Sequence, residues 1–297
     1  MRWPSSNEYL RAAYPSLRAQ LCHRSLQWGA LRQLLNPWNL RFLLSRSNLL
    51  GLALQKEWEI TAKLGELPRM PEWSVNGTTA ENGKRFRFKA ADMGDYELGY
   101  ASCVDFPLSH ALAVSAAFPG GFGPLAIKTD QFTWFKRPWG APLENTAPVK
   151  PVHRRVHLYD GGVYDNIGLE PLFDAGRSKS KIGDACIVVS DAGAPLSIGF
   201  RFAPLNVFRL KRVADIISDQ AHALRVRTFS AYIKADPQRG ALICIGTEIG
   251  DKDSDASAQF AKGFPTTLRK LNQHEFDSLA SHGQAVAADS RLQVKLA

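Results

Sequence analysis

Two aspartates stand where predicted strands end, a position typical of residues that do chemistry. Asp160 closes the run 156–160 and precedes Gly161 and Gly162, and Asp191 follows the apolar run 184–190. Functional groups in α/β sheets gather just beyond the carboxyl ends of strands. The glycines allow unusual backbone angles and let a ligand or a second backbone come close. Asp160 is therefore a candidate catalytic or binding carboxylate, whereas Asp191 is interpreted as a turn or cap residue.

The elements around these aspartates alternate between helical and strand patterns. Residues 1–65 predict three helices, and Glu81-Asn82-Gly83 predicts a hairpin turn between strands 72–80 and 84–90. The continuous apolar run before Asp191 is typical of a buried parallel strand. Strands that alternate with helices indicate a layered α/β domain. The other predicted elements are a helix at 107–118, a strand at 124–129, an aromatic and proline-rich excursion at 130–152, a helix at 206–230, a strand at 240–249 and a helix at 275–292.

Longer strings around Asp160 resemble a known family. "DGGVYDNIGLEPL" and "SHALAVSAAFPGGFGPLAI" are similar to motifs of the patatin-like phospholipase family of bacterial type, and the resemblance extends over about residues 28–292. It implies a three-layer α/β/α domain with a central, mostly parallel sheet. It also implies a single domain over residues 1–297, made of a helical segment 1–65 and an α/β portion 66–297.

The resemblance implies acyl ester hydrolysis by a Ser–Asp dyad. In the family a serine on a G-x-S-x-G turn attacks the ester carbonyl, an aspartate accepts its proton, and glycine N–H groups hold the oxyanion. Asp160 matches the catalytic aspartate, and Gly161 and Gly162 match the two glycines after it. The substrate class implied is a phospholipid or another fatty acyl ester, with neither metal nor cofactor.

The chain departs from the family at the nucleophile. No G-x-S-x-G occurs among the 297 residues, and no glycine-rich oxyanion loop does either. Ser115 and Ser190 are interpreted as scaffold residues. The resemblance therefore indicates the C-terminal part of a domain, truncated at its N-terminus and inactive alone. Three readings stay open: a hydrolase whose upstream part lies outside this sequence, a non-catalytic lipid-binding or interaction module, and one half of a split enzyme whose serine comes from a separate polypeptide.

The loss of upstream strands would have a structural consequence. Val156, Leu158, Ile187 and Val189 are expected to lack some of their neighbours, with strand edges left unpaired. The isolated chain is then expected to aggregate or to pack loosely.

Basic and aromatic residues point to a membrane surface as a partner. The net charge is +9, and residues 1–55 hold seven arginines against the single acidic residue Glu8. This segment could lie on anionic lipid, although an ordinary solvated arginine face explains it too. Trp134, Phe135 and Trp139 stand near lysine and arginine and are candidate lipid contacts. Nucleic acid is not an expected partner, because the arginines are spaced singly.

The remaining composition argues for a cytoplasmic chain. The four cysteines are far apart without a C-x-x-C pair, which disfavours both disulfides and a zinc site. No apolar run approaches the about 18 residues needed to cross a bilayer, and no signal-peptide pattern opens the chain. We expect a cytoplasmic protein with peripheral membrane contact.

Overall fold

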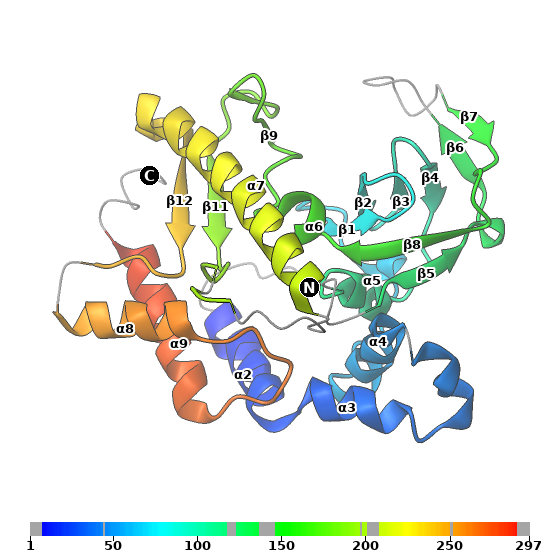
Figure 1. The fold of residues 1–297 in the computed structure, drawn as a ribbon, viewed down its shortest axis with the longest axis horizontal. Coiled ribbons are helices and arrows are strands. Elements are labelled where there is room, and N and C mark those ends of the chain that lie inside the picture. The colour runs from blue at the N-terminus through cyan, green and yellow to red at the C-terminus, as the bar shows by residue number, and fades with distance from the viewer. Residues whose placement is uncertain are drawn as a thin grey trace. The chain divides into compact units, whose positions relative to one another are not determined.

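The chain divides into two compact units, each with its own core (Figure 1). The computed structural model describes residues 8–43, 45–117, 123–136, 146–196, 198–200, 208–249 and 252–289. Unit 1 comprises Met1–Tyr164 with Leu268–Lys270, and unit 2 comprises Asp165–Thr267 with Leu271–Ala297. That residues 1–297 form one patatin-like domain, with a helical segment 1–65 and an α/β portion 66–297, stays a prediction.

Unit 1 begins with short helices, as residues 1–65 predict. The elements are η1 (Tyr9–Ala13), α2 (Tyr14–His23), α3 (Leu26–Gln33), η2 (Pro37–Phe42), α4 (Arg46–Glu57) and η3 (Leu64–Glu66). Asn36 caps η2, since its side chain accepts a hydrogen bond from the Trp38 N–H and Pro37 occupies the first helical position. Ser25 caps α3 in the same way through Trp28 N–H. Leu26, Leu50, Ala53 and Leu54 form a small core between α3 and α4.

The main feature of unit 1 is an eight-stranded sheet, strongly curled in Figure 1. Its order is β5-β8-β1-β2-β3-β4-β6-β7, and every pairing in it is antiparallel. The strands are β1 (Val75–Thr79), β2 (Arg85–Phe88), β3 (Asp92–Asp95), β4 (Gly99–Ser102), β5 (Leu125–Lys128), β6 (Trp134–Lys136), β7 (Ala147–Val149) and β8 (Arg155–Asp160).

Short connections explain why the consecutive strands β1 to β4 are antiparallel. The predicted turn at Glu81-Asn82-Gly83 joins β1 to β2, with Gly83 at a φ of 66°. Comparably short links join β2 to β3 and β3 to β4, and a parallel neighbour would need a crossover of a dozen or more residues. One face of the sheet packs on α5 (Leu108–Val114), and Phe86, Phe88, Met93, Val156 and Leu158 are fully buried there.

Unit 2 holds the only parallel pairing of the described residues. β11 (Ile187–Asp191) pairs with β12 (Gly240–Cys244) in parallel, as the apolar run before Asp191 predicts. α7 (Phe208–Ala235) packs Phe229 and Ile233 against Ile187 and Val189. The other elements are α6 (Gly162–Asp165) at the boundary, β9 (Phe173–Asp174), β10 (Lys179–Ser180), η5 (Pro237–Arg239), α8 (Lys252–Gly263) and α9 (Gln273–Ala288), besides η4 (Thr129–Gln131) in unit 1.

The predicted fold class is therefore wrong. The large sheet is antiparallel, and the strands that end in Asp160 and Asp191 belong to two different sheets. A patatin-like α/β/α arrangement around a mostly parallel sheet does not describe this chain. The strand that ends in Asp160 and the strand that ends in Asp191 were predicted to lie in one sheet. The sequence of a strand does not determine which strand pairs with it, so the pattern could not separate the two.

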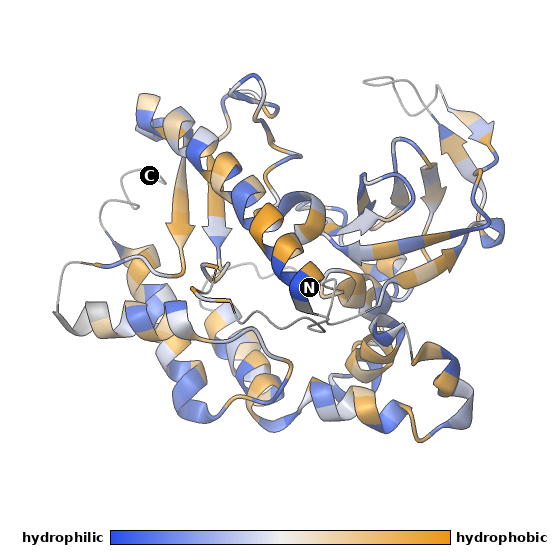
Figure 2. Ribbon diagram, in the orientation of Figure 1, coloured by the Kyte–Doolittle hydropathy of each residue, from blue (hydrophilic) through white to orange (hydrophobic). Residues whose placement is uncertain are grey.

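The expected loss of side-chain neighbours is not found, because Val156, Leu158, Ile187 and Val189 are at most 4 % exposed. β8 has a hydrogen-bonded neighbour on each side, β5 and β1, so its edges are covered, whereas β11 pairs with β12 alone among the described strands. Apolar residues do reach the surface elsewhere, and Figure 2 shows hydrophobic positions along α7 and along the segment from α3 to α4. Among the helices of the described ranges, none combines the length and hydropathy that a bilayer crossing requires.

Candidate functional site

Asp160 is the last residue of β8 and lies within a tight backbone framework. Its N–H donates to the carbonyl of Ala117 at 3.1 Å, just beyond the end of α5. Its own carbonyl accepts a hydrogen bond from the Thr78 hydroxyl at 2.8 Å, and Asp160 lies opposite Gly77 in the β1–β8 register. These contacts fix the position of the Asp160 backbone from both neighbouring segments.

The carboxylate of Asp160 is held at one oxygen. The N–H of Gly162 donates to Oδ1 at 2.6 Å. Within the described part of the chain, Oδ2 accepts no hydrogen bond. Burial raises the pKa of this carboxyl above its ordinary value, and the hydrogen bond from Gly162 opposes that rise. A carboxylate that is partly desolvated, fixed at one oxygen and open at the other is suited to accept a proton.

The two glycines after Asp160 have separable roles. Gly161 is buried, and a Cβ there would lie 2.7 Å from the carbonyl oxygen of Asn76 on β1. Only glycine allows this close approach of the two backbones. Gly162 provides the N–H that holds Oδ1. The sequence-based assignment of both glycines to the site backbone therefore has a physical counterpart, although the catalytic role of Asp160 stays a prediction.

The two serines that we considered lie in different surroundings. Ser115 is exposed at the C-cap of α5, two residues before the Ala117 carbonyl that contacts Asp160. The described hydrogen bonds include none between its hydroxyl and the Asp160 carboxylate. Ser190 is an exposed residue of β11 in unit 2. Neither serine is placed as a nucleophile by its contacts.

Of the candidate lipid contacts, Trp134 is buried rather than exposed. Its side chain is 2 % exposed, and its indole N–H donates to the Thr129 carbonyl at 2.8 Å. Phe135, its neighbour on β6, is 39 % exposed, and Trp139 lies outside the described residues. The burial of Trp134 argues against lipid contact by that side chain. The strand alternation that hides it leaves Phe135 on the surface.

A cavity of about 770 Å³ lies beside this aromatic stretch. Its wall includes Phe132, Trp134, Lys150 and Arg154, but not Asp160. The cavity wall also includes the carboxylate of Asp130, but we place the candidate site at Asp160, because its carboxylate is half-buried, is held by the Gly162 N–H and belongs to the motif.

Asp191 and His222 form a second polar cluster, in unit 2. The side chain of Asp191 accepts from the Gly193 N–H at 2.9 Å, which confirms its role in a turn. In addition, the His222 Nε2–H of α7 donates to Asp191 Oδ2 at 2.8 Å. The two residues are separated by 31 positions, so no local spacing could have predicted this pair. Asp165, three residues after Gly162, accepts from the Glu170 N–H at 2.7 Å and so holds the turn that follows.

The described side chains form no group that could hold a metal ion. In the described ranges, no three or more histidine, cysteine, aspartate or glutamate side chains gather as metal ligands would.

Comparison with known proteins adds no identification. No protein-family model matches the chain, no curated protein matches it, and no solved structure matches its fold. The function of this chain is therefore inferred from the motif around Asp160 and from the contacts of that residue.

The raised pKa of Asp160 makes a prediction about stability. A carboxyl whose pKa is higher in the folded state than in the unfolded state stabilises the fold below the unfolded pKa. That stability is lost as the pH rises through the folded pKa. Asp160→Asn removes this loss and keeps an oxygen that can accept from Gly162. We expect the variant to melt above the wild type near neutral pH, by about 2–4 °C for each kcal/mol regained.

Thermal melts at two pH values check this prediction. Below the ordinary aspartate pKa of about 3.9, both states of the wild type bind the proton, so the two melting temperatures should converge. If the melting temperatures of variant and wild type differ by the same amount at both pH values, the effect comes from packing and not from ionisation of Asp160.

Proposed function

We propose that this chain supplies the carboxylate of a Ser–Asp dyad that hydrolyses fatty acyl esters, including phospholipids. The observation that carries the proposal is the state of Asp160: fixed at Oδ1, open at Oδ2 and made more basic by burial. The string "DGGVYDNIGLEPL" supports it through its resemblance to the catalytic aspartate motif of patatin-like phospholipases. The antiparallel sheet differs from that family's arrangement, so the fold is not part of the support.

The proposed chemistry needs a serine from outside these 297 residues. Its Oγ attacks the ester carbonyl carbon while its proton passes to Oδ2 of Asp160. The tetrahedral intermediate then collapses to the acyl-serine, and the departing alcohol takes the proton back from Asp160. Water next attacks the acyl group with Asp160 again as the base, which releases the fatty acid and restores the serine.

The test is an assay of the chain as it occurs in its native cells. A tagged chain is isolated together with any polypeptide that accompanies it, and the preparation is given a short-chain nitrophenyl ester and a fluorophosphonate probe. We expect turnover, and labelling of a serine that belongs to the accompanying polypeptide. Asp160→Asn should lower kcat by at least about 10³-fold, because the serine loses its base.

The matched control is Asp105→Asn. Asp105 is an exposed carboxylate of unit 1 that pairs with Lys63, so its replacement should leave turnover unchanged. Hydrolysis that persists at the wild-type rate in Asp160→Asn would overturn the proposal.

A non-catalytic lipid-binding module is the second candidate. The observation that favours it is that no serine hydroxyl among the described residues contacts the Asp160 carboxylate. Under this alternative, the isolated preparation binds lipid, whereas no serine in it reacts with the probe.

A further inference from the structure

The segment from α3 to the C-cap of η2 buries Leu26 but presents most of its other large apolar side chains to the outside. Trp28 is 64 % exposed, Leu35 82 % and Trp38 78 %. Together with the other exposed apolar residues of this segment they form what we call the Trp/Leu surface: Trp28, Leu31, Leu35, Trp38, Leu40 and Leu43. On α3, Trp28 and Leu31 follow the spacing i, i+3 and so share one helical face, and Leu35 lies in the turn after the helix.

The same segment buries polar and small residues. Gln33 is 5 % exposed and its amide donates to the Gly29 carbonyl at 3.3 Å. Asn39 is 8 % exposed and its amide donates to the Gln33 carbonyl at 2.9 Å. Gly29 lies so close to α4 that a Cβ would contact Glu57 at 2.6 Å. An amphipathic helix normally does the opposite, burying tryptophan and leucine.

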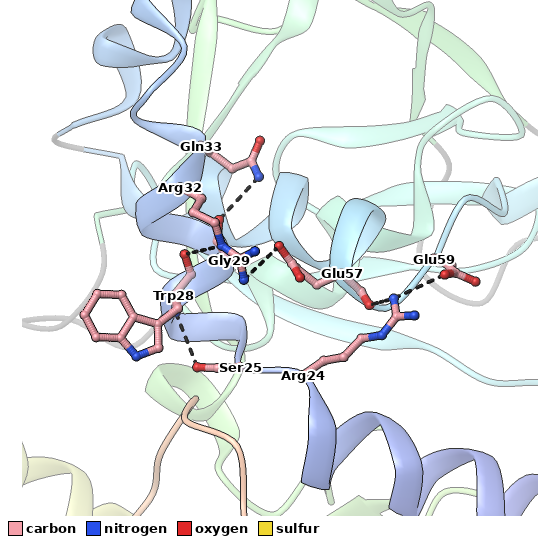
Figure 3. Close-up of polar contacts among 8 residues, drawn as sticks. All are labelled: Arg24, Ser25, Trp28, Gly29, Arg32, Gln33, Glu57 and Glu59. Atoms are coloured by element: carbon pink, nitrogen blue, oxygen red, sulfur yellow. Dashed lines mark hydrogen bonds and ion pairs between the residues drawn. The ribbon is translucent and has the colours of Figure 1, made fainter.

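Polar contacts hold this orientation in place. Arg32 pairs with Glu57 at 3.4 Å, and Arg24 pairs with Glu59 at 3.2 Å and donates to the Glu57 carbonyl. Figure 3 shows these contacts on the side of α3 that faces α4, with the Trp28 indole pointing away from them. A rotation of α3 that buried Trp28 would break the ion pair of Arg32 with Glu57 and move Gly29 away from its close approach to Glu57. The exposure of the apolar face is therefore part of the folded structure.

The charges within the segment that carries the Trp/Leu surface are all positive, although Glu57 at the end of α4 pairs with Arg32 beside it. No acidic residue occurs between Leu26 and Lys56, whereas Arg32, Arg41 and Arg46 are exposed. The Arg41 guanidinium lies over the Phe42 ring at 4.6 Å, which keeps its charge next to apolar surface. Tryptophan and leucine beside Arg41, in a segment with no carboxylate of its own, match the chemistry of the bilayer interface, where indoles sit at headgroup depth and arginines meet lipid phosphates. A protein partner does not require this exclusion of acidic residues.

We propose that the Trp/Leu surface binds the interface of bilayers that contain anionic phospholipid, with Arg41 close to the headgroups. This site is distinct from Trp134, Phe135 and Trp139. It does not depend on the proposed hydrolytic function, because binding needs no turnover.

Sedimentation with vesicles tests the proposal. The full chain is mixed with vesicles of phosphatidylcholine alone and with vesicles that also contain phosphatidylglycerol. We expect binding to the anionic vesicles that weakens as salt is raised. Trp28→Ala combined with Trp38→Ala should lower the partition coefficient at least about tenfold, because two large apolar side chains no longer enter the interface. Arg41→Gln should weaken binding to the anionic vesicles alone.

The matched control is Leu210→Ala combined with Ile217→Ala. These two α7 residues are 82 % and 65 % exposed, so their replacement removes comparable apolar surface elsewhere and should leave binding unchanged. Asp160→Asn should bind as the wild type does, which separates this test from that of the hydrolytic function. Absence of vesicle binding by the wild type, or equal binding by the double tryptophan variant, would overturn the proposal. In that case, self-association that depends on Trp28 and Trp38 would assign the surface to a second copy of the chain.

Discussion

Asp95→Ala is expected to lower the free energy of unfolding of unit 1 by about 3–5 kcal/mol. The Asp95 carboxylate is 2 % exposed and accepts hydrogen bonds from four donors. These are the Thr79 hydroxyl at 2.7 Å, the Asn82 amide at 3.1 Å, and the N–H groups of Glu97 and Leu98 at 2.9 and 2.8 Å. The variant removes the acceptor from three donors on buried or half-buried residues, Thr79, Asn82 and Leu98, and each unpaired donor costs about 1–3 kcal/mol before the structure relaxes.

The loss should reach the candidate site. Asp95 joins the turn between β1 and β2 to the turn between β3 and β4, and β1 is the strand that lies beside Asp160. Urea unfolding followed by circular dichroism measures the change. The control is Asp105→Ala, whose side chain is 84 % exposed and should change stability by at most about 0.5 kcal/mol. A similar small change in Asp95→Ala would contradict the role we assign to the buried carboxylate.

Gly161→Val is expected to cost about 3 kcal/mol or more and to displace Asp160. Even the first added carbon would lie 2.7 Å from the Asn76 carbonyl oxygen and 2.9 Å from the Asn76 carbonyl carbon. These atoms belong to β1, which cannot move without losing its pairing with β8 and β2. The Thr78 hydroxyl contact to the Asp160 carbonyl should be lost as the two segments separate.

A glycine substitution at an open position gives the comparison. Gly283 lies inside α9, and a Cβ there would have nothing within 4 Å. Gly283→Ala should be neutral or raise stability by about 0.5–1 kcal/mol, since alanine favours helix. Denaturant midpoints of the two variants check the contrast. Equal midpoints would show that the contact with Asn76 can relax at little cost.

Local features of the fold were predictable because nearby residues determine them. The turn at Gly83, the cap at Asn36, and the strands before Asp160 and Asp191 depend on residues within a few positions. The close approach of Gly161 to β1 was predictable only in part. The sequence indicates that glycine is needed after Asp160, but only the structure shows that Asn76 is the reason.

Features that join distant residues were not predictable. The hydrophobic pattern of β8 is the same whether its neighbours run parallel or antiparallel, so the pattern alone could not reveal β1 and β5 as its partners. The pairing of His222 with Asp191 was not predictable either, because the two residues are separated by 31 positions. The resemblance in the motif around Asp160 implied a mostly parallel sheet, whereas the sheet that contains β8 is antiparallel.

By itself, therefore, the sequence determined where the chain turns, where its strands end and that a carboxylate followed by two glycines closes β8. The tertiary structure decided the antiparallel partners of that strand, the burial that raises the pKa of Asp160 and the donor that holds its Oδ1. It also decided that Trp134 is buried while Trp28 and Trp38 are exposed. The physical reason is that burial depends on which elements pack together, and many arrangements of elements satisfy one local pattern.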